Sequence, residues 1–236
     1  INIIANTVKT VEGVKLLDID PGKATNRTVI TFVGEPKNVI EAAFRLIKKA
    51  SELIDMSKQT GEHPRFGATD VCPLVPIANI SMEETAKFAH KLGKRVGNEL
   101  GISGYFYENA ATSNDRKNLA TVRSGEYEGL KDKLSNPKWK PDFGPTEYNK
   151  QVTTSGVTAI SARDFLIAYN VNLNSTSTRR ANAIAFDIRE NGRAKVINGK
   201  KVLDKNGEVE RIPGKLKAVK GIGWFIDEYG IAQISY

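Results

Sequence analysis

Cysteine and histidine, the side chains that most often bind metals or attack substrates, are scarce in this chain. Its 236 residues include one cysteine, Cys72, and two histidines. A single cysteine cannot form an internal disulfide, which is typical of proteins from a reducing interior. Two distant histidines and one cysteine do not have the spacing of a zinc site, so we expect no metal.

Long hydrophobic runs are also missing, and none approaches the length needed to cross a bilayer. The first residues, Ile-Asn-Ile-Ile-Ala-Asn, lack the basic front and the small-residue cleavage site of a signal peptide. These features predict a cytoplasmic protein without a membrane segment. Phosphate-cradling and dinucleotide-binding glycine motifs are absent, and so is the G-x-S-x-G motif of serine hydrolases.

The formal net charge is +8, which fits nucleic acid, an acidic membrane or small anionic substrates as a partner. Lysines and arginines are spread along the chain among acids, without a dense basic block or interleaved aromatic residues. Nucleic-acid binding through stacking or a basic patch is therefore not expected. A positive field that attracts polycarboxylates fits this distribution, as does a charge that serves only solubility.

The hydrophobic pattern predicts a mixed α+β chain. A helix opens at Pro36, and Ser81 with Glu84 has the form of a capping box, so a second helix begins there and ends at Gly101. Strands are predicted over residues 14–19, 27–33, 71–77, 105–107, 165–173, 219–226 and 231–234. Further helices are predicted over 1–12, near 119–123 and 127–134, and around 181–188. Turns are predicted at Pro21-Gly22, Asn198-Gly199 and Asn206-Gly207.

One stretch, residues 55–73, holds His63 in a setting suited to chemistry. Pro64 pushes His63 toward an extended conformation, and Gly61 and Gly67 allow turns on either side. A histidine in such a loop, between a helix and a strand, can point into a cleft. The same pattern also fits a surface histidine without a task.

Two other reactive side chains have structural interpretations. His90 is on the charged side of a predicted helix, near Lys87 and Lys94, so we expect it to be solvated. Cys72 falls in an apolar predicted strand, where a free cysteine usually packs as a small hydrophobic residue. This placement disfavours the alternative of a Cys–His hydrolase built from Cys72 and His63.

Seven blocks follow one another along the chain: LLDID (16–20), TNRTV (25–29), GEHPRFGATDVCP (61–73), RSGEYE (123–128), PDFGP (141–145), FLIAYNVNL (165–173) and AVKGIGW (218–224). Together they resemble the glutamate formiminotransferase family, which occurs alone or as the front part of formiminotransferase-cyclodeaminase. The resemblance runs nearly from end to end of the chain. It implies transfer of a formimino group from N-formimino-L-glutamate to N5 of the co-substrate tetrahydrofolate, in histidine degradation.

His63 matches the catalytic histidine of that family and is expected to be the general acid/base. A single imidazole can take a proton from the attacking N5 and return it to the departing glutamate amine. Asp20, at the end of a predicted strand, is expected to hold the imidazole tautomer, with Asp18 and Glu62 as weaker candidates. Capping of the following turn is the alternative role for Asp20.

Both substrates carry carboxylates, so the resemblance also implies basic residues around the site. Arg65 and then Arg27 are the candidates, because guanidinium groups suit carboxylates; Arg65 could instead pair with an acid in a loop. Asn26 either bonds a substrate or forms the turn. The family's folate-binding segment matches residues 144–156, with three extra residues inside it, and gives Gly144, Pro145, Thr146 and Gly156 as folate-binding candidates.

The family fold implies two ferredoxin-like α/β sandwich subdomains whose sheets face a shared cleft, crossed by the segment 109–150. We expect an N-terminal subdomain at 1–160 and a C-terminal subdomain at 161–236, the latter incomplete. We also expect that the chain begins late relative to the family, and that it forms a homodimer. A noncatalytic folate- or anion-binding module, and a formyltransferase that uses formylglutamate, are the alternative functions.

Overall fold

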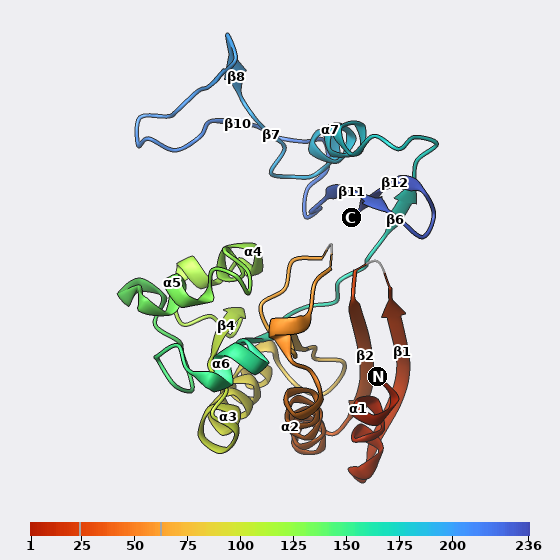
Figure 1. Cartoon of the computed structure of the whole chain (residues 1–236), viewed down its shortest axis with the longest axis vertical. Coiled ribbons are helices and arrows are strands. Elements are labelled where there is room, and N and C mark those ends of the chain that lie inside the picture. Colours follow the sequence, from red (N-terminus) through yellow and green to blue (C-terminus); the bar gives the residue numbers. More distant parts are fainter. Residues whose placement is uncertain (24, 62) are drawn as a thin grey trace. The chain divides into compact units, whose positions relative to one another are not determined.

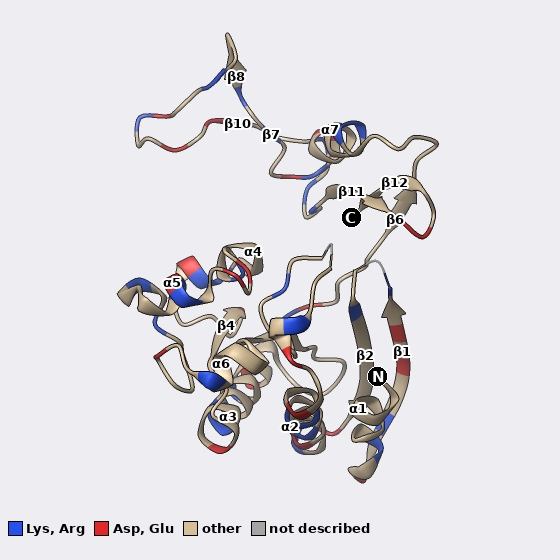
Figure 2. Cartoon of the chain, in the orientation of Figure 1, with Lys and Arg blue, Asp and Glu red and all other residues tan. Residues whose placement is uncertain are grey.

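The computed structural model describes residues 1–23, 25–61 and 63–236. The chain forms two compact units, unit 1 (Ile1–Phe165) and unit 2 (Leu166–Tyr236). Each unit contains both helices and strands (Figure 1), so the predicted α+β class is confirmed. None of the helices in the described ranges combines the length and the apolar character needed to span a bilayer. Lysines and arginines are interspersed with acids along the chain (Figure 2).

A three-stranded parallel sheet is the centre of unit 1. Its strands, in the order β3-β5-β4, are Val71–Leu74, Thr158–Ala162 and Gly104–Glu108. One face packs against helices α2 (Pro36–Leu53) and α3 (Met82–Leu100), where Phe106 and Ile160 join a large buried cluster. Strand β3 ends three residues before the predicted end at 77, because Pro76 has no N–H to donate to a ladder.

The two helices have the predicted ends. Pro36 is in the first turn of α2, and the Ser81 hydroxyl accepts from the Glu84 N–H while the Glu84 carboxylate accepts from the Ser81 N–H. Gly101 ends α3 with a φ of 64°, a left-handed conformation that glycine adopts without strain. These caps fix where each helix meets the sheet.

The other face of the sheet is covered by the segment after β4. The segment contains five short helical pieces: η3 (Asn114–Arg116), α4 (Leu119–Val122), α5 (Leu130–Ser135), η4 (Pro137–Trp139) and α6 (Lys150–Ser155). Val122 and Leu130 of this layer are buried against Tyr105 and Tyr107 of β4. Short helices were predicted near both α4 and α5 and are confirmed. The layer closes over the loop that carries His63, since Phe66 belongs to the same cluster.

Strands β1 (Val14–Gly22) and β2 (Arg27–Gly34) form a separate antiparallel ribbon beside α2 (Figure 1). The predicted turn at Pro21-Gly22 is wrong, because these residues still pair with Thr28 and Arg27. The chain reverses between Lys23 and Asn26 instead. The predicted helix at the start is broken into α1 (Asn2–Asn6) and the single 3₁₀ turn η1 (Val8–Thr10).

Unit 2 is a small antiparallel sheet, β11-β12-β6, with one helix on it. Its elements are β6 (Asn170–Asn172), α7 (Thr178–Ile188), β11 (Ile222–Ile226) and β12 (Ile231–Ser235). Ala181 and Ala185 of α7 pack on Ala232 and Ile234. Ile184, predicted to face inward, is exposed.

The strand predicted over 165–173 is confined to β6, and residues 165–167 are exposed. Apolar character alone produced that prediction, but a strand also needs a ladder partner, which begins at Tyr169 and Tyr236. The charged extension holds β7 (Arg193–Ala194), β8 (Val196–Ile197), β9 (Lys200–Lys201) and β10 (Arg211–Ile212). Asn198 and Gly199 have φ values of 50° and 77° and join β8 to β9, which confirms that hairpin turn.

Candidate active site

His63 lies in the loop between η2 (Met56–Lys58) and β3, and it is half-buried. Among the described residues it makes two hydrogen bonds. Nδ1 lies 2.7 Å from the Pro64 carbonyl oxygen, and Nε2 lies 2.5 Å from Nη1 of Arg27. A carbonyl only accepts and a guanidinium only donates, so the proton is assigned to Nδ1 and Nε2 carries the lone pair.

The surroundings favour the neutral imidazole. Burial lowers the pKa of His63 to about 4, and the positive charges of Arg27 and Arg123 act in the same direction. The bond to the Pro64 carbonyl opposes them. At neutral pH His63 is therefore a neutral base whose Nε2 lone pair accepts from Arg27, and neutrality is the state that a general base must have before the reaction.

Arg27, the first residue of β2, is a half-buried cation. Burial lowers its pKa, while the charges of Asp70 and Asp20 oppose this at longer range. Within the described ranges Arg27 forms no ion pair, and its guanidinium is bonded to a neutral ring. A desolvated guanidinium in this state has unused capacity for a carboxylate.

The turn before Arg27 is fastened to the His63 loop. Asn26 has a φ of 45°, and its Nδ2 donates to Gln59 Oε1 at 3.1 Å and to the Thr60 carbonyl at 2.7 Å. A Cβ on Gly61 would lie 2.7 Å from the Thr25 carbonyl oxygen, so only glycine allows this approach. Of the two roles considered for Asn26, the structure shows the one in the turn. The hydrogen bonds of Asn26 to Gln59 and Thr60 bring the neighbouring Arg27 to His63.

Asp70 and Arg123 form a second layer that the sequence did not indicate. One oxygen of Asp70 accepts from the Phe66 N–H at 3.0 Å, and the other lies 2.9 Å from Nη2 of Arg123. The side chains of Arg123 and Asp70 are only 11% and 14% exposed. Both residues lie inside blocks that carry the family resemblance, which was the one signal that could have pointed to them.

Arg65 ties the loop to the segment that follows α4. Its Nη1 and Nη2 lie 3.0 and 2.7 Å from the two carboxylate oxygens of Glu128, and Nη2 donates to the Gln59 carbonyl at 2.9 Å. The backbone adds a bond from Tyr127 N–H to the Arg65 carbonyl at 2.9 Å. Arg65 is thus paired with a loop acid, the alternative considered for it, and a substrate carboxylate would have to compete with Glu128.

Asp20 is an exposed residue of β1, opposite Val29. The atom that faces Nδ1 of His63 is the Pro64 carbonyl oxygen, so the tautomer expected from Asp20 is set by the backbone. Asp18 is likewise exposed on β1. Glu62, the remaining candidate, lies outside the described residues.

Comparisons with known proteins show the family of the chain. A family model described as the N-terminal subdomain of the formiminotransferase domain matches residues 1–163, and one described as the formiminotransferase domain matches residues 168–236. The chain belongs to the formiminotransferase family. It is 47% identical over 235 residues to the formimidoyltransferase-cyclodeaminase of Dictyostelium discoideum, with 100% of this chain and 40% of that protein covered.

Two shorter relatives are named glutamate formimidoyltransferase. That of Thermoplasma acidophilum is 42% identical over 237 residues, covering 100% of this chain and 70% of that protein. That of Streptococcus pyogenes serotype M1 is 42% identical over 229 residues, covering 97% and 69%. The chain thus spans about 40% of the length of the formimidoyltransferase-cyclodeaminases that it matches.

The segment predicted to bind folate is built around two glycines. Gly156 forms a bridge with Gly67, and a Cβ on it would lie 2.1 Å from the Phe66 carbonyl oxygen, so the structure brings it to the His63 loop. Gly144, with a φ of 76°, and Pro145, whose carbonyl accepts from Ser103 Oγ at 2.6 Å, lie beside the start of β4. Thr146 is exposed.

The second histidine, His90, is half-buried, so the prediction that it is solvated is wrong. Nε2 of His90 lies 2.8 Å from the Ala110 carbonyl oxygen, and its ring meets the Phe106 ring edge-on at 4.5 Å. The chain after β4 covers this side of α3. Cys72 packs against the helix-covered face of the sheet, as predicted, and burial raises the pKa of its thiol to about 12.

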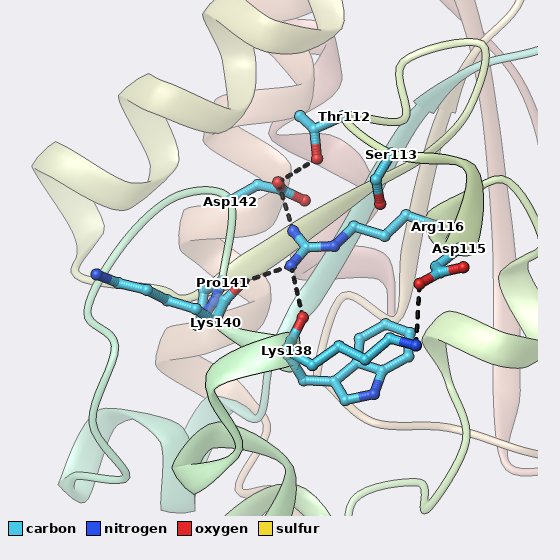
Figure 3. Close-up of a pocket in the computed structure, with 9 residues that line it drawn as sticks. Thr112, Ser113, Asp115, Arg116, Lys138, Lys140, Pro141 and Asp142 are labelled. Atoms are coloured by element: carbon cyan, nitrogen blue, oxygen red, sulfur yellow. Dashed lines mark hydrogen bonds and ion pairs between the residues drawn. The ribbon is translucent and has the colours of Figure 1, made fainter.

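A hollow of about 450 Å³ opens in unit 1, but His63 is not among its lining residues (Figure 3). In its wall Asp142 accepts from Thr112 at 2.6 Å and pairs with Arg116 at 2.5 Å, and Lys138 pairs with Asp115 at 3.0 Å. Most charges of this hollow are therefore already matched. Among the described residues no group of three or more His, Cys, Asp or Glu side chains could hold a metal ion.

Proposed function

We propose that this chain transfers the formimino group of N-formimino-L-glutamate to N5 of tetrahydrofolate, giving 5-formiminotetrahydrofolate and L-glutamate in histidine degradation. The observation that carries the proposal is the pairing of a neutral imidazole, with its lone pair on Nε2, and a half-buried arginine. The names of the relatives support the transfer. Carboxylates on both substrates suit a site where the charges that act on His63 among the described residues, Arg27 and Arg123, are cations.

His63 moves one proton in two steps. As N5 bonds to the formimino carbon, Nε2 takes the N5 proton and the carbon becomes tetrahedral. The imidazolium then gives that proton to the glutamate nitrogen as its bond to the carbon breaks and the carbon–nitrogen double bond of the formimino group re-forms. The net change is one formimino group exchanged for one proton, and His63 ends neutral.

Arg27 binds a carboxylate of the donor in this scheme and so places the formimino carbon at His63. Arg123 adds positive potential behind it, fixed by Asp70. Asp20, which raises the pKa of Arg27, helps to keep that group charged. Gly156 shapes the folate side of the loop, with Gly144, Pro145 and Thr146 further along the same segment. Arg65 binds a substrate carboxylate once that carboxylate has displaced Glu128. We place the enzyme in the cytoplasm as a homodimer.

The test is direct: protein, tetrahydrofolate and formiminoglutamate are mixed, and the formation of 5-formiminotetrahydrofolate is followed by absorbance. Multiple turnovers are expected. Folate binding without turnover would replace the proposal by a noncatalytic folate-binding module. In a parallel reaction formylglutamate is the donor, and a higher kcat/KM with it would make the chain a formyltransferase.

A further inference from the structure

Arg27 is hydrogen-bonded to Nε2 of His63, the ring nitrogen that the proposed reaction needs. Its Nη1 lies 2.5 Å from Nε2 of His63, the nitrogen that carries the lone pair. A guanidinium has no acceptor atom and does not release its proton, so it cannot relay a proton from N5. While this contact lasts, the attacking amine cannot reach the base, and the site is closed to chemistry.

The contact is weaker than the one a substrate offers. A hydrogen bond from a guanidinium to a neutral ring lacks the attraction of opposite charges, whereas a carboxylate binds the same group through two charge-assisted bonds. Burial of Arg27 strengthens that difference, because a desolvated charge gains more from an opposite charge. A donor carboxylate should therefore take the guanidinium from His63.

We propose that Arg27 is a latch on the catalytic base: it covers Nε2 of His63 in the free protein, and the α-carboxylate of the donor opens it. This inference rests on the proposed function. In an N-acylated amino acid the α-carboxyl carbon is about 2.5 Å from the reacting nitrogen, two bonds of about 1.5 Å away. The γ-carboxyl carbon is four bonds from that nitrogen, two more than the α-carboxyl carbon. The α-carboxylate is thus the group that reaches a guanidinium beside the imidazole while the formimino carbon faces Nε2.

Other charged or titratable groups among the described residues act on the two side chains of the latch. Arg123 acts on His63, and Asp70, Tyr107 and Asp20 act on Arg27. Asp70 is held by Arg123 and by the Phe66 N–H, so it is not the acceptor that frees His63. When the latch opens, Arg27 leaves His63 and its charge is neutralised by the donor carboxylate. Arg123 is then the remaining cation of the two that lower the pKa of His63.

The experiment is an NMR titration of the histidine ring signals of the whole chain against pH, with N-formyl-L-glutamate and without folate. This ligand has the donor's shape with oxygen in place of the imino nitrogen. The chain has two histidines, so a His90→Gln variant assigns the His63 signal. We expect the pKa of His63 to rise from about 4 toward its ordinary 6.5 when the ligand is bound. The α-amide of the ligand, which lacks the charge, should leave it unchanged, and the γ-amide should act like the ligand.

Arg27→Gln is the matched variant. It should raise the pKa of His63 in the free protein and abolish the response to formylglutamate, and an unchanged His90 signal shows that the variant is folded. An unchanged His63 pKa in wild-type protein saturated with formylglutamate would overturn the latch. Turnover in the absorbance assay together with that result would keep the proposed transfer and remove only the latch. A pKa rise without turnover would keep the latch and remove the transfer.

Discussion

Replacing Asp70 by alanine is expected to destabilise unit 1 by about 3–5 kcal/mol, because it leaves the Arg123 charge buried without its partner. The side chain of Arg123 is 11% exposed, and its Nε has no hydrogen-bond partner among the described residues. The substitution also removes the acceptor for the Phe66 N–H, a charge-assisted bond of about 1.5–3 kcal/mol that is part of the same total.

The ion pair itself contributes little net stability. Burial raises the pKa of Asp70 even though Arg123 lowers it, so the attraction does not fully offset the desolvation of the carboxylate. Removing both charges, in Asp70→Asn with Arg123→Met, should therefore cost only about 1–2 kcal/mol. The coupling energy is the loss in the double variant minus the sum of the losses in the two single variants. It should be large, whereas additive effects would make it zero.

Urea unfolding followed by tryptophan fluorescence measures these values. The chain has two tryptophans, Trp139 in unit 1 and Trp224 in unit 2, so a Trp224→Phe background makes the signal report unit 1. The control is Asp115→Ala, which breaks an exposed ion pair with Lys138 and should cost less than about 1 kcal/mol. A loss below about 1 kcal/mol for Asp70→Ala would show that Arg123 is solvated and would refute the reasoning.

Three other predictions concern the same unit. For His63, whose pKa is lowered from 6.5 to about 4, the stability that the neutral ring provides is present above pH 6.5 and lost as pH falls toward 4. Between pH 7 and pH 5 the free energy of unfolding of wild type should fall by about 1 kcal/mol more than that of His63→Gln, a figure reduced for the partial exposure of the ring. An equal shift of the urea midpoint in the two proteins would contradict this. Gly67→Ala places a Cβ 1.9 Å from the Val157 carbonyl oxygen and should cost about 3 kcal/mol or more in urea unfolding. A Cβ on Gly101 would meet open space but a φ of 64°, so Gly101→Ala should cost only about 1–2 kcal/mol. Similar losses for the two variants would show that the backbone near Gly67 shifts to make room for the methyl group. The thiol of Cys72, whose burial raises its pKa to about 12, should react with a disulfide reagent at pH 8 at least ~100-fold more slowly in the native protein than in urea. Similar rates in the two states would place that thiol in contact with solvent.

Local chemistry predicted much of the fold. The cap formed by Ser81 and Glu84, the left-handed Gly101 and the Asn198-Gly199 turn depend on a few neighbouring residues, so the sequence contains their cause. Predictions that depended on distant partners were less accurate. Pro21 and Gly22 remain in β1 because β2 pairs with them, and a proline is tolerated in a two-stranded ribbon.

The site shows the same division. His63 could be singled out from its glycine-flanked loop and the family resemblance. Its contacts could not, since Arg27 is 36 residues away and reaches it only because Asn26 fastens the hairpin to the loop. Arg65 was a reasonable carboxylate ligand by type, but Glu128, 63 residues later, pairs with it. Tertiary structure decides which arginine is paired with an acid, as Arg65 is, and which is bonded to a neutral group, as Arg27 is.

The rate of formimino transfer by His63→Ala, measured with saturating donor and folate, tests the central claim most directly. A fall of at least ~100-fold in kcat, with the Kd for folate changed less than about twofold, is expected if His63 carries the proton. His90→Gln is the control, and its rate should match that of wild type because His90, on α3, packs against Phe106 of β4 and not at the site. A His63→Ala variant that turns over as fast as wild type would contradict the claim.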